Sequence, residues 1–290
     1  MKNRIKIIMM IFPLALILVS LPMLSWAAED SQSAEPAQTE DKVTGEVAAS
    51  VLSAYIWRGQ ELSRHSVVIQ PSLTAGYKGF TANVWGNLDT DPYSGADDEY
   101  SSNYTETDLT LSYTHSFGIV SAGVGYIYYG LAAATPDGPD LLDSQEVFVT
   151  MGLDTILAPT LTVYKEIDHY HQWYATLGVS HTFSLHEKVG LKLAAVASYL
   201  KSEDETTYPE FDSDALATAD KFNNLHDGMI SASLPISLTD HWTITPTVTY
   251  VFPLSGDAKD EMKGRGLQGT SPSDRDSSYL YGGMILSFAF

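Results

Sequence analysis

The sequence predicts an antiparallel, up-and-down β-barrel of about twelve strands that spans a bilayer. Three observations predict this fold class: a period of two in the apolar residues, connections that alternate between short and long, and a secretion signal ahead of the barrel. Strands with one face in lipid and the other in a polar lumen show this alternation. Such a barrel has an even number of strands, and we expect both termini on the periplasmic side.

The N-terminal residues predict export from the cytoplasm. Residues 1–27 contain three basic residues near the start, an apolar run over 7–19, and the exit Ser25-Trp26-Ala27. Small residues at positions −3 and −1 are typical of a cleaved signal peptide, and an uncleaved anchor is the alternative. Residues 28–42 are rich in Ser, Ala, Glu, Gln and Pro and predict a disordered acidic leader. Residues 43–290 are then the barrel.

Composition excludes several classes of protein. The chain has 36 acidic and 16 basic residues and a formal net charge of −20, which argues against a nucleic-acid partner because such binding needs clustered Lys and Arg. It has no cysteine, so neither a disulfide framework nor a thiolate metal site is expected. No window after the signal approaches the ~20 consecutive apolar residues of a membrane helix. A helical membrane protein is therefore excluded.

The alternation defines twelve segments, each long enough for a tilted strand that crosses a bilayer. They are residues 44–57, 67–78, 80–88, 104–116, 119–130, 144–156, 160–168, 171–184, 188–201, 226–238, 242–254 and 278–290. The connections after the even-numbered segments are at most three residues long, whereas five of the six after the odd-numbered ones are long and polar. Short turns at one end and long loops at the other are typical of an outer-membrane barrel.

The last segment shows which face meets lipid. In residues 278–290 the even positions are mostly apolar, and the odd positions include Tyr281, Gly283, Ser287 and Ala289. A soluble sandwich would turn the apolar face toward a core, but a membrane barrel turns it toward lipid. The terminal Phe288 and Phe290 are similar to the C-terminal signal that the barrel assembly machinery recognises. Aromatic residues near strand ends predict interfacial girdles: Tyr55, Trp57, Tyr113, Tyr126, Tyr128, Trp173, Trp242 and Tyr250.

Residues 53–63, SAYIWRGQELS, close the first predicted strand. We expect Tyr55 and Trp57 on the lipid face at headgroup level, Arg58 in the lumen, and Gly59 at the start of a loop. The alternative for Arg58 is contact with lipopolysaccharide phosphates at the rim.

Residues 44–89 resemble the start of the TorF-type porin family of proteobacterial outer-membrane proteins, also labelled Gcw_chp. The matching features are Tyr-x-aromatic-Arg-Gly at the end of the first strand, a Pro-containing second strand, a Gly-aromatic turn and an aromatic-Gly third strand. They correspond to Tyr55, Trp57, Arg58, Gly59, Ser63, Pro71, Gly79, Phe80, Trp85 and Gly86. The leader and the acidic loop near 202–225 depart from the pattern. The resemblance implies an outer-membrane location and a porin-like role, without a substrate or catalytic residues.

The predicted lumen face is mostly small and hydroxylic, with ionisable groups near one end. These pore-mouth and lumen residues are Arg58, Glu106, Asp108, Glu146, Glu166, Asp168 and Asp227, with Lys192 deeper. Carboxylates in a narrow mouth favour cations and repel anions. In the alternative, they pair with Arg, Lys or Tyr side chains and plug the barrel.

Metal and enzyme chemistry are weakly indicated. Asp168-His169-Tyr170-His171 places two imidazoles beside a carboxylate, but a polar tight loop explains it without a metal. The acidic loops, among them 89–99 and 203–214, lack the spacing of a calcium loop and are interpreted as solvated. His115, His181 and His226 lie on or beside strands, but no local hydrolase motif accompanies them. We expect no cofactor, no bound metal and no enzyme activity.

The sequence therefore predicts an outer-membrane, porin-like channel for small hydrophilic solutes, with a mild preference for cations. Its expected partners are outer-membrane lipids and lipopolysaccharide, the barrel assembly machinery, and small polar solutes or cations. Two alternatives remain open: a closed barrel that acts through its acidic loops, and an outer-membrane lipid hydrolase.

Overall fold

The structure is a computed structural model that describes residues 42–64, 66–92, 103–132, 143–266 and 271–290. The predicted signal peptide, residues 1–27, and nearly all of the predicted leader, residues 28–42, lie outside the described residues. Asp97, Asp98 and Glu99 of one acidic loop also lie outside them.

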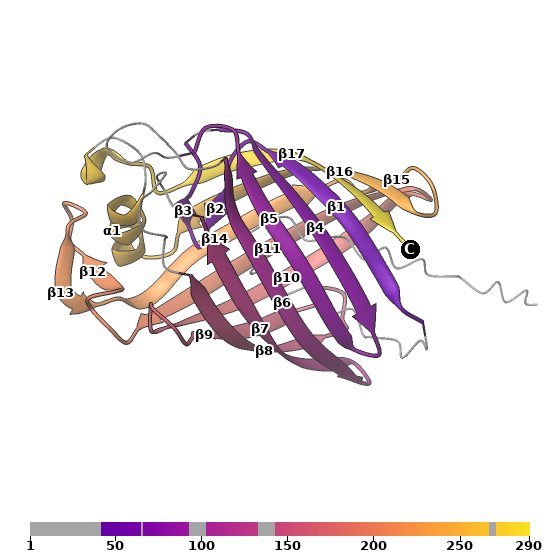
Figure 1. Cartoon of the computed structure of the whole chain (residues 1–290), viewed down its shortest axis with the longest axis horizontal. Helices are drawn as coiled ribbons and strands as arrows, with labels where there is room; N and C mark the ends of the chain where they lie inside the picture. Colours follow the sequence, from indigo (N-terminus) through magenta and orange to yellow (C-terminus); the bar gives the residue numbers. More distant parts are fainter. Residues whose placement is uncertain (1–41, 65, 93–102, 133–142, 267–270) are drawn as a thin grey trace, which may run out of the picture.

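The described strands form one closed antiparallel barrel (Figure 1). Its wall has twelve spanning strands, because the two-residue β15 continues the line of β14. They are β1 (Thr44–Leu52), β4 (Val68–Tyr77), β5 (Phe80–Asp89), β6 (Tyr104–Phe117), β7 (Val120–Leu131), β8 (Ser144–Leu153), β9 (Thr160–Glu166), β10 (Gln172–His186), β11 (Val189–Ser202), β14 (Asn223–Ser233), with β15 (Ile236–Ser237), β16 (Trp242–Pro253) and β17 (Tyr279–Ala289). Each predicted segment overlaps one of these strands, so the strand count and fold class are confirmed.

The first and last strands close the barrel. β1 pairs with β17 in an antiparallel register that sets Val47 opposite Phe288. Beyond the last ladder residue, Gly45 and Phe290 exchange two backbone hydrogen bonds of 2.9 Å. The start of β1 and the C-terminus therefore lie at the same end of the barrel as the short turns (Figure 1). In the described part of the wall, closure leaves no strand with an unpaired edge, which a lipid-exposed sheet could not tolerate.

The two faces of the wall have the predicted chemistry. In β17 the outward Leu280 is 73% exposed, whereas the inward Tyr281 is 3% exposed. In β16 the apolar Trp242, Val248 and Tyr250 are exposed, and the alternate threonines are buried. An apolar exterior around a polar interior is the opposite of a water-soluble fold. This barrel is therefore built to span a membrane, in the strand-based manner of outer-membrane proteins.

The ends of the barrel differ in their connections. At one end the strands are joined by tight turns; between β4 and β5, Lys78 and Gly79 have φ angles of 50° and 87°, as a two-residue hairpin turn of type I′ requires. The long-loop end carries extra elements: β2 (Ile56–Trp57), β3 (Gln60–Glu61), β12 (Pro209–Phe211), β13 (Ala217–Lys221), α1 (Gly256–Arg265) and η1 (Pro272–Asp274). No helix in the part of the chain that is described is long and apolar enough to cross a membrane.

Two clusters of buried apolar side chains fill the lumen near the long-loop end. One includes Tyr55 and Ile56 with the wall residues Trp85 and Tyr281. The other combines Met262 of α1 with wall tyrosines and Leu200. The core of the protein therefore lies inside the barrel, at one end of it.

Candidate functional site

Residues 53–63 fold into the lumen and do not continue the first wall strand. After β1 ends at Leu52, β2 and β3 form a small hairpin, which we call the inner hairpin (residues 53–63). Its turn is Arg58-Gly59, with φ angles of 43° and 73°, again the geometry of type I′. Its base is tied by hydrogen bonds from Leu62 N to Tyr55 O (2.8 Å) and from Tyr55 N to Ser63 Oγ (2.9 Å).

This hairpin corrects three predictions. The first strand ends at residue 52 and not at 57, and neither Tyr55 nor Trp57 faces lipid. Tyr55 packs on Trp85 of β5 with ring centroids 5.6 Å apart, and Trp57 meets Tyr129 of β7 edge-on at 6.5 Å. Both partners are inward-facing residues, because the hairpin buries its aromatic side chains in the lumen.

Arg58 lies in the lumen, near its long-loop end, and is fully buried there. Its side chain is 0% exposed, and its Nη2 donates to both carboxylate oxygens of Glu146, each at 2.8 Å. Tyr129 also donates to Glu146, at 3.1 Å. Burial alone would lower the pKa of Arg58, but the Glu146 carboxylate raises it, with the net result above the ordinary value. The guanidinium therefore stays charged, and contact with lipopolysaccharide at the rim is excluded for this residue.

Glu106 and Asp108 occupy the inner face of β6 beside the hairpin. The Tyr55 hydroxyl donates to Glu106 at 2.8 Å. Burial raises the pKa of Tyr55 well above its ordinary value, and the two nearby carboxylates raise it further, so this hydroxyl remains a donor. Asp108 is 1% exposed and lies beside Glu106 on this inner face. These carboxylates therefore line no open mouth in this conformation.

Asp227 reaches the lumen through an irregularity in β14. The register with β11 shifts around Ser198, so His226 and Asp227 both lie opposite this one residue. Such a bulge turns an extra side chain inward. Asp227 Oδ1 accepts hydrogen bonds from Ser198 Oγ (2.6 Å) and Tyr174 Oη (2.9 Å), and faces His226 Nδ1 at 2.8 Å. Asp227 thus joins strands β10, β11 and β14.

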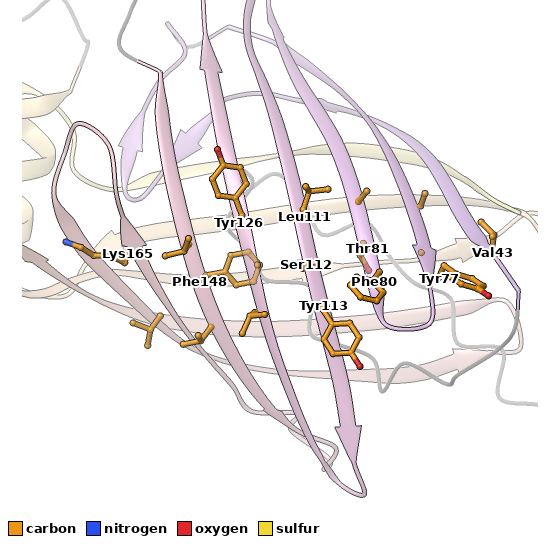
Figure 2. A pocket seen from close by; sticks show the side chains of 18 of the residues that line it. Val43, Tyr77, Phe80, Thr81, Leu111, Ser112, Tyr113, Tyr126, Phe148 and Lys165 are labelled. Atoms are coloured by element: carbon orange, nitrogen blue, oxygen red, sulfur yellow. The ribbon is translucent and has the colours of Figure 1, made fainter.

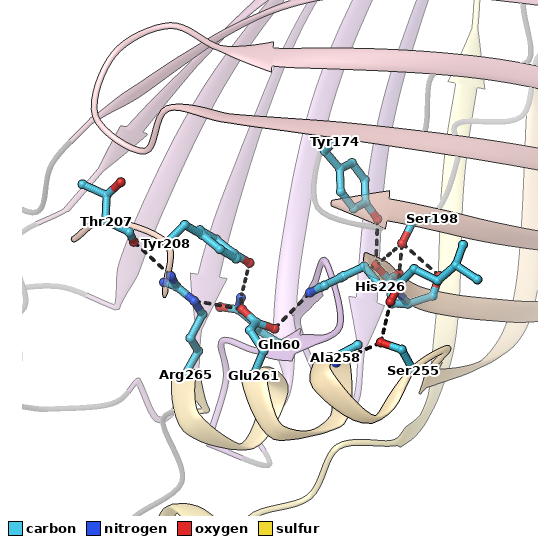
Figure 3. A network of polar contacts seen from close by, with 12 residues as sticks. Gln60, Tyr174, Ser198, Thr207, Tyr208, His226, Ser255, Ala258, Glu261 and Arg265 are labelled. Atoms are coloured by element: carbon cyan, nitrogen blue, oxygen red, sulfur yellow. Dashed lines mark hydrogen bonds and ion pairs between the residues drawn. The ribbon is translucent and has the colours of Figure 1, made fainter. Parts of the chain in front are cut away.

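Helix α1 packs against the hairpin and the wall through Glu261 (Figure 3). The buried Glu261 carboxylate faces His226 Nε2 at 2.9 Å, accepts from Gln60 Nε2 at 3.1 Å, and pairs with Arg265 Nε at 2.8 Å. Both ring nitrogens of His226 face carboxylates, those of Asp227 and Glu261. Only the protonated ring can donate a hydrogen bond to each of them, because it carries a hydrogen on both nitrogens. The inner hairpin and α1 together form what we call the plug.

Two further contacts fix the plug. A Cβ at Gly59 would lie 2.2 Å from Met262 Cε, so a larger residue at this turn position would displace the Met262 side chain of α1. The Arg265 guanidinium lies 3.6 Å from the ring centroid of Tyr208 and donates to Thr207 O at 2.9 Å. Burial and the neighbouring Glu261 carboxylate raise the pKa of Tyr208 well above its ordinary value. Its hydroxyl accepts from Gln60 at 3.2 Å.

Glu166 and Asp168 have roles other than the predicted lining of the mouth. The Glu166 carboxylate accepts four backbone N–H bonds, of 2.7 to 3.1 Å, from residues 168–171, and a further bond from Ser144 Oγ at 3.0 Å. It therefore holds the tight connection between β9 and β10. Asp168 is part of that connection and accepts from Gln145, an outward-facing residue of β8, at 3.0 Å. Glu166 thus has the inward position predicted for it, but its carboxylate is engaged by the turn. Asp168 bonds to an outward-facing side chain, so the prediction that it lines the mouth is wrong.

The short-turn half of the lumen has a different lining. Thr81, Ser112 and Thr150 on its inner face are partly exposed, unlike the residues around the plug. Lys192 of β11 also points inward here, between Thr182 and Ser233 of the neighbouring strands, and is partly exposed. The described lumen is therefore filled at one end and more open toward the other.

The remaining predicted aromatic residues lie on the outside. Tyr113, Trp173, Trp242 and Tyr250 are exposed, and Tyr126 and Tyr128 are half-buried on the same outward face. Phe290 is exposed, and Phe288 stacks on it with ring centroids 6.1 Å apart. A hollow of about 920 Å³ on this exterior, lined by residues such as Tyr77, Phe80, Leu111 and Tyr113, is almost wholly apolar (Figure 2). It faces lipid and not the lumen.

No group of three or more His, Asp or Glu side chains that could hold a metal ion occurs among the described residues. In the Asp168-His169-Tyr170-His171 loop, His169 Nδ1 lies 2.6 Å from Asp143 O, so that ring is engaged with the backbone. Asp204 and Asp212 in the 203–214 loop accept backbone N–H bonds of their own turns, at 2.9 to 3.0 Å.

Several site residues escaped the sequence analysis. Tyr164 and Tyr174 alternate correctly for the inner face, so their inward position was available from the pattern. Helix α1 also left a signal: Ser255 caps its N-terminus, Asp257 lies in the first turn, and Lys263 and Arg265 lie in the last. No comparable signal marks Glu261 or the irregularity at Ser198, because both depend on contacts between distant segments.

The chain was compared with known proteins. No protein-family model matches it and no curated protein matches it, so membership of the TorF-type family is not confirmed. Among solved structures, it is similar to the NanC porin, with 10% identity, a TM-score of 0.49, and coverage of 85% of this chain and 98% of that one. It is also similar to the COG4313 outer membrane channel from Pseudomonas putida F1, with 12% identity, a TM-score of 0.47, and coverage of 88% of this chain and 99% of that one. An anion-selective porin from Comamonas acidovorans shares 11% identity with it at a TM-score of 0.34, with coverage of 86% of this chain and 99% of that one.

Such low identities and TM-scores do not identify a solute or a mechanism.

Proposed function

We propose that this protein is an outer-membrane channel for passive diffusion of small hydrophilic solutes, closed in this conformation by its plug. One observation carries the proposal: the segments that fill the lumen, residues 53–63 and α1, are not strands of the wall. Side-chain contacts such as Arg58–Glu146 and Glu261–His226 hold them in place. A wall that is complete without its contents can open when they move.

The location follows from the exterior and from the predicted signal peptide. Lipid and lipopolysaccharide cover the apolar outer face, with Trp173 and Tyr250 among the girdle residues at headgroup level. The long-loop end faces the cell exterior and the short-turn end, with both termini, faces the periplasm. Phe288 and Phe290 present the strand that the barrel assembly machinery recognises.

The charges predict a preference for cations in the open state. Glu106, Asp108, Glu146 and Asp227 belong to the wall, whereas the buried cation paired with Glu146, Arg58, belongs to the plug. Movement of the plug removes that cation and leaves the wall carboxylates to set the electrostatic barrier. Opening and cation selectivity then arise from the same event.

The test is the conductance of the refolded protein in planar bilayers. The proposal expects rare, brief openings for the unchanged protein and frequent ones for Glu261→Gln, because this change weakens the contact of α1 with His226 of the wall. Lys259→Gln, on the exposed side of the same helix, is the matched control and should behave as the unchanged protein. If Glu261→Gln folds and stays silent under all voltages, the channel proposal is wrong.

Selectivity is tested separately by the reversal potential under a KCl gradient. Glu106→Gln with Asp108→Asn should shift the reversal potential of the open state toward that of a non-selective pore. An unchanged reversal potential would show that other groups control the ion preference.

A closed barrel that serves as a structural or surface-interaction protein is the second candidate. The burial of Asp108, Glu146 and Asp227, each at most 1% exposed, favours it, because no continuous aqueous path passes these residues in this conformation. Silence of both the unchanged protein and the Glu261→Gln variant would select this candidate.

A lipid hydrolase is not supported by the side-chain arrangement. Ser198 Oγ bonds to Asp227 and not to His226, so the imidazole is not placed to activate this serine. All three groups are buried inside the barrel, away from lipid. We therefore propose a role without catalysis.

A further inference from the structure

Arg58 is surrounded by wall residues from four consecutive strands. Glu146 of β8 accepts both hydrogen bonds from Nη2, and Tyr129 of β7 donates to the same carboxylate. The guanidinium carbon lies 4.2 Å from the ring centroid of Tyr174 in β10 and 5.8 Å from that of Tyr164 in β9. The wall therefore offers a carboxylate and two aromatic rings to one planar cation.

The hairpin places this side chain at an unfavourable backbone position. Arg58 has a φ of 43°, in the left-handed region, at the first turn position, where Gly, Asn and Asp are preferred. A long cationic side chain gains nothing there from local conformation. The contacts of the guanidinium with the wall supply the compensating stabilisation.

The chemistry of the pocket selects among cations. A guanidinium is planar, is more weakly hydrated than an ammonium, pairs well with a carboxylate, and stacks on aromatic rings. A small inorganic cation keeps its hydration shell more strongly and gains less from ring faces. The surroundings of Arg58 thus match a guanidinium group better than a hydrated alkali ion.

We propose that Glu146, Tyr164 and Tyr174, supported by Tyr129, form a binding site for solutes with a guanidinium group, and that Arg58 occupies this site as an intramolecular ligand. A solute with this group competes with Arg58 and favours displacement of the hairpin. Binding at the site is independent of whether the barrel conducts; only the coupling to opening rests on the proposed channel function.

Chemical rescue tests the site. Arg58→Ala leaves the pocket without its cation, and we expect the variant to unfold at a lower urea concentration than the unchanged protein. Methylguanidinium at low millimolar concentration should raise its unfolding midpoint, whereas equal concentrations of methylammonium or sodium chloride should not. Arg64→Ala, which removes an exposed arginine near the same hairpin, is the control and should show no rescue.

Two further variants locate the bound cation. Glu146→Gln or Tyr174→Leu, each combined with Arg58→Ala, should abolish or strongly reduce the rescue. Arg58→Lys keeps a charge near the pocket but lacks the planar group, so it serves if Arg58→Ala does not fold, and methylguanidinium should stabilise it too. Equal effects of methylguanidinium and methylammonium, or rescue that survives Glu146→Gln, would overturn the site.

The unfolding measurement needs no ion current. Rescue by methylguanidinium in a barrel that does not conduct would therefore support the binding site and contradict the channel function. Conductance without rescue would support the channel function and contradict the binding site.

Discussion

The two halves of the lumen share one wall but differ in what they contain. Near the long-loop end, the inward side chains of β6, β8 and β14 are buried against the plug. Most of their carboxylates accept a hydrogen bond from another side chain or form an ion pair. Toward the short turns, the inward Thr81, Ser112 and Thr150 are partly exposed. The same alternation of residues thus gives a packed core at one end and a polar lining at the other. What differs is whether a segment outside the wall folds back into the lumen.

The largest expected difference between the halves is the cost of removing a charge. Arg58→Ala leaves Glu146 buried without its cation, which should lower the free energy of unfolding by about 3–5 kcal/mol. Lys192→Ala, in the more open half, should cost about 1 kcal/mol or less, because solvent reaches that region. Urea unfolding in detergent micelles measures both. Equal costs would contradict the contrast between the halves.

Next in size is the turn held by Glu166. Glu166→Ala removes the acceptor of four backbone N–H groups and should cost roughly 2–3 kcal/mol, with faster proteolysis within residues 167–171. Asp168→Ala, which loses one partly exposed bond, should cost about 0.5 kcal/mol. If both variants resist unfolding and proteolysis equally, Glu166 does not hold this connection.

A glycine pair separates backbone strain from packing in the plug. Gly59 and Gly118 have similar φ angles, 73° and 66°, but a Cβ at Gly118 meets nothing within 4 Å. Gly118→Ala should therefore cost about 1 kcal/mol from strain alone. Gly59→Ala should cost about 1 kcal/mol more and increase amide hydrogen exchange in α1, because the new methyl group displaces Met262. Similar exchange in both variants would mean that α1 does not depend on this contact.

The smallest expected change in the free energy of unfolding is at a buried hydroxyl group of the inner wall that has no hydrogen-bond partner in the described part of the chain. The buried Thr249 hydroxyl has no hydrogen-bond partner among the described residues, so Thr249→Val should be neutral or slightly stabilising. Ser198→Ala should cost about 1–2 kcal/mol, because Asp227 loses a partner at 2.6 Å. Unfolding midpoints of the two variants, measured side by side, decide the comparison.

The sequence predicted the wall well, for a simple reason. Outward and inward residues of a barrel strand meet different media, so the alternation in β16 and β17 encodes the face directly. Two-residue turns such as Lys78-Gly79 are equally local. The lumen location of Glu106, Asp108, Glu146 and Lys192 followed from the same alternation, whereas Arg58 reaches the lumen through the inner hairpin and Asp227 lies at an irregularity of β14.

The errors have one cause. Residues 53–57 continue the alternation of β1, so the pattern could not show that the chain leaves the wall after Leu52. Tyr55 and Trp57 are as well suited to a buried aromatic cluster as to a membrane interface, and only the presence of Trp85 and Tyr129 across the lumen selects the first. Glu166 likewise has the position of a lumen residue and the contacts of a turn residue.

The sequence by itself therefore determined a twelve-stranded barrel, the chemistry of its two faces and the gathering of the long loops at one end of it. Only the tertiary structure decided that the lumen is plugged, that Arg58 is bound by Glu146 between aromatic rings, and that α1 contacts the wall through Glu261. The physical reason is the distance along the chain over which each kind of interaction acts. Alternation and turn preferences act between residues next to one another in the chain, whereas the contacts of the plug join segments 88 and 35 residues apart, and their strength depends on burial that the closed barrel provides.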